Sequence, residues 1–116
     1  MIARRLRRTL ARTTEDLHAE ALQARFAAGA TPIAEAPERG AVRVRGEVAA
    51  LQVEPRAGAP ALEITLDDGT GRAVIVFTGR THIGGLDPGR AVEVVGMARR
   101  TGGRLVLVNP EYRLLS

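Results

Sequence analysis

The sequence predicts a mainly β fold, a five-stranded Greek-key barrel preceded by an α-helical arm. Three observations predict it. Residues 41–116 contain five short apolar segments, and in the first two of them apolar and polar residues alternate, as they do in β-strands. Glycine-rich turns separate these segments, whereas the apolar residues of positions 1–30 follow helical spacing. We therefore interpret the 116 residues as a basic, amphipathic helical arm (1–30), a linker (31–40) and one barrel domain (41–116).

The arm carries an apolar stripe at the helical period, formed by Ile2, Leu6, Leu10, Leu17, Ala21, Ala24 and Ala28. Thr13 or Thr14, followed by Glu15 and Asp16, is also a good helix start, since a hydroxyl caps free N–H groups and acids suit the positive end. One helix and two helices therefore both remain open, and Gly29 ends either arrangement. The prolines of residues 31–40 predict an extended linker.

The barrel segment opens with alternating valines around Gly46, where a strongly bent strand leaves no room for a side chain. Asp68-Gly69 predicts a tight hairpin turn that pairs Thr65 with Arg72. The connection 79–89 is too rich in glycine for a helix. The predicted strands are 42–48, 62–67, 72–78, 91–98 and 104–108.

The same alternation predicts which side chains face the barrel interior. Val42, Val44, Leu62, Ile64 and Leu66 point inward, which places Arg43, Arg45, Glu63 and Thr65 outside. The parity of the hairpin sends Ala73, Ile75 and Phe77 inward and Arg72, Val74 and Val76 outward. A one-residue bulge would exchange the two faces. We expect Phe77 in the core rather than on a binding surface.

The net charge is positive, and the charged residues are unevenly distributed along the sequence. All 17 basic residues are arginine, the net charge is +4, and residues 1–12 contain five arginines and no acid. Guanidinium groups bind phosphate through paired donors, so this distribution favours an anionic partner such as nucleic acid. The arm could hold nucleic acid, or pack on the barrel or on a partner.

Several kinds of chemistry are excluded or disfavoured. The absence of cysteine excludes disulfides, thiolate catalysis and cysteine metal sites, and leaves His18 and His82 as the only imidazoles. Asp67 and Asp68 are adjacent and belong to a turn, so they do not form a catalytic pair. We predict no enzyme activity, metal or cofactor. No apolar run approaches the roughly 20 residues of a membrane span, and the arginine-rich start lacks the apolar region of a secretory signal, so we expect a cytoplasmic protein without membrane attachment.

Five motifs occur in order along residues 39–116: Val42-x-Val44-x-Gly46-x-Val48, Leu66-Asp67-Asp68-Gly69-Thr70-Gly71, Leu86-x-Pro88-Gly89, Val94-x-Gly96 and Asn109-Pro110-Glu111-Tyr112. Their order and spacing resemble the OB-fold nucleic-acid binding domains, such as the wedge domain of RecG-type helicases and the domains that bind tRNA anticodons. The whole chain is similar to small stand-alone OB-fold proteins of actinobacteria. The resemblance implies that nucleic acid lies across the barrel face and its adjoining loops.

The candidate contacts are arginines of the outer face and loops together with one aromatic residue: Arg43, Arg45, Arg72, Arg80, Arg99, Arg100, Arg104 and Tyr112. Arg56 is a further loop arginine. With no tryptophan, one tyrosine and two phenylalanines, little base stacking is available, so we expect phosphate contacts of low sequence specificity to single-stranded DNA or RNA. The alternative is a protein-interaction or oligomerisation module that docks a partner on its Val74–Val76 face and through the helical arm.

Overall fold

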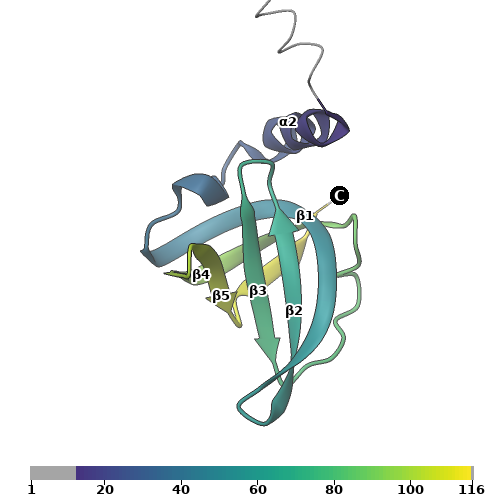
Figure 1. Cartoon of the computed structure of the whole chain (residues 1–116), viewed down its shortest axis with the longest axis vertical. Coiled ribbons are helices and arrows are strands. Elements are labelled where there is room, and N and C mark those ends of the chain that lie inside the picture. The colour runs from purple at the N-terminus through teal and green to yellow at the C-terminus, as the bar shows by residue number, and fades with distance from the viewer. Residues whose placement is uncertain (1–12, 116) are drawn as a thin grey trace, which may run out of the picture.

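A computed structural model, which describes residues 13–115, contains a closed barrel with a helix at one end (Figure 1). Its elements are α2 (Thr14–Phe26), the 3-10 turn η1 (Ile33–Glu35), β1 (Arg39–Arg56), β2 (Ala59–Asp67), β3 (Arg72–Thr78), β4 (Ala91–Thr101), β5 (Arg104–Val108) and β6 (Glu111–Leu114). The strands pair in the order β1-β2-β3-β5-β4, and β4 pairs with β1 to close the barrel. Among the strand pairs of residues 13–115, the β3–β5 pair is parallel and the others are antiparallel. The predicted five-stranded OB barrel is confirmed.

Strand β1 continues well beyond Val48, where the sequence predicted its end. Residues 39–47 pair with β4, residues 47–56 pair with β2, and the register shifts between Val48 and Ala50. Near this bend, a Cβ atom on Gly46 would lie 2.8 Å from the carbonyl oxygen of Asp67. The bend therefore requires glycine, as the sequence predicted, and the second half of β1 forms a hairpin with β2.

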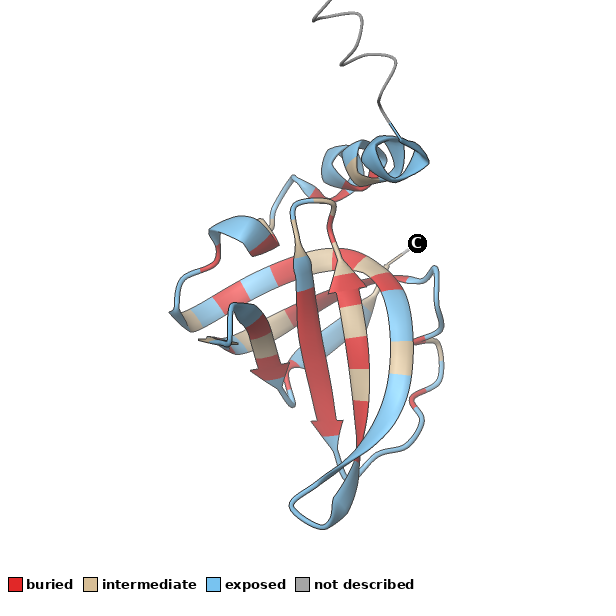
Figure 2. Ribbon diagram, in the orientation of Figure 1, coloured by how far each residue is buried: buried red, intermediate tan, exposed pale blue. Residues whose placement is uncertain are grey.

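Buried residues alternate with more exposed ones along β2 and the first half of β1, whereas β3 is buried almost throughout (Figure 2). Alternate residues of the strands fill the barrel interior. Ile75 and Phe77 belong to this core, so the predicted inward face of β3 is confirmed. Val74 and Val76 do lie on the opposite face, but they are also buried, in a small cluster with Ala61. They pack against Ala61 of β2 and Val106 of β5, on the two neighbouring strands. Little apolar surface remains there for a protein partner.

The hairpin between β2 and β3 differs from its predicted pairing. Arg72 pairs with Asp67, and Val74 pairs with Thr65, because the connection spans residues 68–71 rather than two residues. The carboxylate of Asp68 accepts hydrogen bonds from the backbone N–H groups of Thr70 and Gly71 and stabilises this longer turn. The predicted pairing was wrong by two residues, which leaves the assignment of faces unchanged.

Helix α2 starts at the threonine-rich segment, with Thr13 and Asp16 forming a capping box. It packs on one end of the barrel through Leu22 and Phe26, which lie four residues apart. The predicted stripe is wrong in this region, since Leu17, Ala21, Ala24 and Ala28 are exposed. The larger apolar side chains of the helix make this packing contact, and the backbone of Ala19 lies close to Gly69 of the β2–β3 turn. The other predicted stripe positions, Ile2, Leu6 and Leu10, lie outside the described residues.

The connecting segments also pack on the barrel. The linker contains η1, whose Ile33 is buried in the main core, and is less extended than predicted. Residues 79–90 contain no helix, as expected. Strand β6 was not predicted, and Asn109, with a positive φ of 51°, separates it from β5. None of the helices within residues 13–115 has the length and apolar character needed to span a membrane.

Candidate nucleic-acid interface

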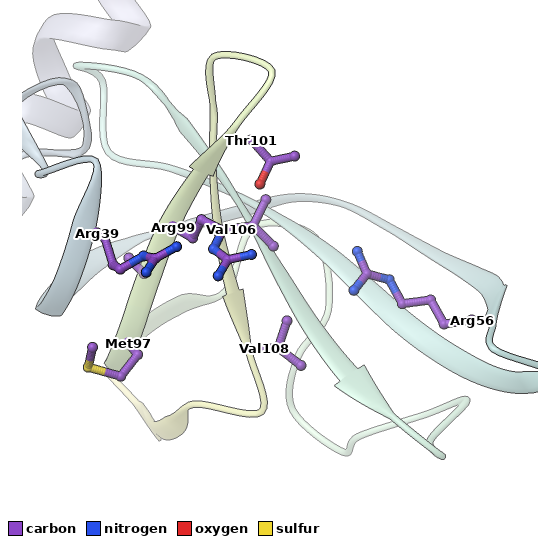
Figure 3. A pocket seen from close by; sticks show the side chains of 8 residues that line it. Arg39, Arg56, Met97, Arg99, Thr101, Val106 and Val108 are labelled. Carbon is purple, nitrogen blue, oxygen red and sulfur yellow. The ribbon is translucent and has the colours of Figure 1, made fainter.

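An open groove of about 460 Å³ lies on the outer face of the barrel, where β1, β4 and β5 meet (Figure 3). Three of its lining residues are arginines, and the rest are apolar or small. It is lined by Arg39, Arg56, Met97, Ala98, Arg99, Thr101, Val106 and Val108. The groove thus combines positive charge with an apolar floor.

The arginines stand on two sides of that floor. Arg39 and Arg99 come from neighbouring strands and lie on one side of the two valines, whereas Arg56, from the end of β1, lies on the other (Figure 3). The floor is open to solvent, since Val108 is 46% exposed and Met97 is 65% exposed. Such a surface suits a ligand that carries both negative charges and flat apolar groups.

The groove arginines carry uncompensated charge. Arg39 and Arg99 face each other directly in the β1–β4 register. Within residues 13–115, no carboxylate forms an ion pair with Arg39, Arg56 or Arg99. Like charges at directly opposed positions of a sheet destabilise it by roughly 0.2–1 kcal/mol. An anionic ligand would remove this repulsion.

A second group of arginines surrounds Glu93, a buried residue of β4. Arg43 donates from Nη1 to one carboxylate oxygen at 2.6 Å, and Arg45 donates from Nε to the other at 2.7 Å. Arg113 donates from Nη2 at 3.1 Å. The hydrogen bond from Arg45 lowers the pKa of Glu93 below its ordinary value of 4.5, and Arg113 and Arg43 lower it further. Burial raises this pKa, but the three arginines together outweigh that effect. Glu93 is therefore ionised at neutral pH and holds three guanidinium groups in place.

The remaining predicted contacts are dispersed. Arg100 donates to the backbone carbonyls of Ile33 and Ala36 and thereby ties the linker to β4. Arg72 pairs with Asp67 beside the hairpin at 3.2 Å. Tyr112 is partly exposed and packs edge-on against Phe77, with ring centroids 5.6 Å apart.

Arg80 and Arg104 are exposed in loop or strand-end positions. Of the arginines that the sequence singled out, Arg56 and Arg99 line the groove.

The described residues contain no cluster of acids and histidines suited to a metal ion. His18 lies 3.7 Å from Glu47, which also pairs with Arg25, so its carboxylate bridges α2 and β1. His82 lies in the exposed connection between β3 and β4.

The barrel topology and its basic outer face agree with the comparison to known families. A family model of the OB-fold nucleic acid binding domain, of the tRNA anticodon type, matches residues 42–115. The chain belongs to this family. A search among curated proteins found no match to the sequence. The matched segment contains the whole barrel after the first residues of β1, and thus most of the groove.

Sequence reasoning about this OB-fold domain missed Arg39 and the apolar floor of Met97, Val106 and Val108. Arg39 was overlooked because the first strand was predicted to begin later. A signal was present, since Arg39 has the same odd parity as Arg43 and Arg45 and therefore faces outward on an extended strand. The apolar floor belongs to the β4–β5 hairpin, in which Val106 pairs with Arg99, but Arg39 and Arg56 reach it from β1 only when the barrel closes.

Proposed function

We propose that this OB-fold domain binds single-stranded nucleic acid in the groove, with Arg39, Arg56 and Arg99 contacting phosphates. The observation that carries the proposal is the presence around an open apolar floor of three arginines that form no ion pair with a carboxylate of residues 13–115. Bases of a single strand are free to lie on such a floor, whereas those of a duplex are stacked inside the helix. Phosphate contacts position a strand without reading its sequence, so the expected specificity is low.

Electrostatics supplies most of the affinity in this proposal. The groove has no aromatic side chain on which a base would stack for about 1–3 kcal/mol. Arginine planes and the valine floor offer weaker stacking, and the phosphate contacts remain. Each phosphate neutralised on a single strand contributes about −0.7 to the slope of log affinity against log salt. Three groove arginines thus account for a slope of about −2.

The test compares the full chain with a variant in which Arg39, Arg56 and Arg99 are all replaced by alanine. Fluorescence anisotropy with a labelled single-stranded oligonucleotide, measured across a salt series, reports both affinity and slope. We expect the triple variant to bind about 10- to 100-fold more weakly at low salt and its slope to be shallower by about 2.

Arg90→Ala is the matched control, since Arg90 is exposed, forms no ion pair within residues 13–115 and lies outside the groove. A folded triple variant that keeps the affinity and slope of the Arg90→Ala control would refute the proposal. That result would favour the alternative function, the docking of a protein partner.

A further inference from the structure

The Glu93 cluster, made of Glu93, Arg43, Arg45 and Arg113, lies outside the groove and carries excess positive charge. One carboxylate faces three guanidinium groups, and the Glu93 side chain is only 5% exposed. The arginine side chains cover it from β1 and β6. Because one negative charge offsets only one of the three positive charges, the cluster presents two uncompensated charges to solvent.

Most donors of the outer two arginines remain available. A guanidinium group has five N–H donors. In the hydrogen bonds described, Arg43 uses only Nη1 and Arg113 only Nη2, and their side chains are 50% and 63% exposed. Arg45 is more fully engaged, since its Nη1 also donates to the carbonyl oxygen of Ala28. Glu93 therefore orients Arg43 and Arg113 while leaving their outer edges free for an anion.

The cluster continues the outer face on which the groove lies. Arg43 follows Arg39 by four residues on β1, a distance of about 13 Å along a strand. An even spacing on a strand places both side chains on the same, outer face. Between them lies Ala41, which pairs with the groove residue Met97. A strand that leaves the groove along β1 and β4 reaches the cluster without crossing another element.

We propose that the Glu93 cluster is a second phosphate site, which holds phosphodiester groups of a single strand after it leaves the groove. This inference rests on the proposed function of the groove. Glu93 acts as a positioning residue, and the free edges of Arg43 and Arg113 make the contacts. OB folds cover about 4–16 nucleotides, so a strand near the lower end fills the groove alone and a longer one extends to the cluster.

The test uses two labelled oligothymidylates, of about 4 and about 12 nucleotides, with the full chain and its Arg113→Ala variant. In this variant Glu93 keeps its two shorter bonds, to Arg43 and Arg45. We expect the affinity for the longer strand to fall by about 3- to 10-fold and its salt slope to become shallower by about 0.7. Affinity for the short strand changes by less than about two-fold, since the groove is intact.

Arg90→Ala again serves as the charge-matched control, and thermal unfolding checks that each variant is folded. If Arg113→Ala destabilises the fold, Arg43→Ala supplies the same readout while Arg45 and Arg113 remain on Glu93. Equal losses for both strand lengths, or a loss no larger than that of Arg90→Ala, would overturn the second site. Failure of the unsubstituted chain to bind either strand would instead overturn the proposed function of the groove. Binding of both strands with equal affinity would overturn only the second site.

Discussion

The groove and the Glu93 cluster use the same residue type on the same outer face in opposite ways. In the cluster, arginines are held by a buried carboxylate, whereas in the groove Arg39 and Arg99 face each other without one. The paired arginines stabilise the barrel, and the unpaired ones cost stability unless an anion is bound. The comparison teaches that the position of an arginine does not by itself reveal its role, since a buried carboxylate can hold a guanidinium group in the fold and still leave its outer donors free.

The largest expected effect comes from removing the carboxylate. In Glu93→Ala, three arginines lose their shared acceptor and repel one another, so we expect the free energy of unfolding to fall by about 2–3 kcal/mol. This is below the range for fully buried pairs because water reaches Arg43 and Arg113. Urea unfolding measures the loss.

Glu111→Ala is a suitable control, since it removes an exposed acid from β6 and should change stability by no more than about 0.5 kcal/mol. Similar stability of Glu93→Ala and Glu111→Ala would show that the cluster contributes little to the fold.

A smaller loss of stability is expected at acidic pH. Because Arg45, Arg113 and Arg43 lower the pKa of Glu93, its contribution to stability is fully present above the ordinary pKa of 4.5 and is lost as the pH falls through the lower pKa of the folded state. We expect the stability of the unsubstituted chain to decline more steeply below pH 4.5 than that of Glu93→Gln. Urea unfolding at a series of pH values measures both curves, and parallel curves would contradict the assignment.

The smallest expected effect is an increase in the free energy of unfolding. Arg99→Ala removes the repulsion with Arg39, so we expect the free energy of unfolding to rise by roughly 0.2–1 kcal/mol while oligonucleotide affinity falls. Thermal unfolding and anisotropy on the same preparations measure the two quantities. A variant that loses both stability and affinity would indicate that Arg99 supports the fold rather than a ligand.

Much of the barrel could be predicted because the determinants are local. The short apolar runs of residues 72–78 and 104–108, each between turn residues, predicted the bounds of β3 and β5, and Gly46 marked the bend of β1. The hairpin pairing was wrong because the carboxylate of Asp68 stabilises a longer turn than Asp68-Gly69 alone suggests. The apolar stripe was wrong in α2 because contact with the barrel, rather than helical periodicity, selected Leu22 and Phe26 for burial.

The candidate site was harder to predict than the fold. The sequence favoured arginine contacts on the outer face, yet it did not distinguish Arg99, which lines the groove, from Arg100, which ties the linker to β4. These adjacent residues point to opposite sides of one strand and meet different neighbours. Arg39 and Arg56 lie at the two ends of β1, and closure of the barrel brings both to the same groove.

By itself, the sequence determined the strand pattern, the glycine bend, the helix start and the excess of arginine, since each depends on residues close together in the chain. The tertiary structure alone decided which arginines are paired. Glu93 lies 50 residues from Arg43 and 20 from Arg113, and their meeting depends on the register between β1, β4 and β6. Electrostatic interactions depend on distance in space, so the role of each charge was decided only when the barrel closed.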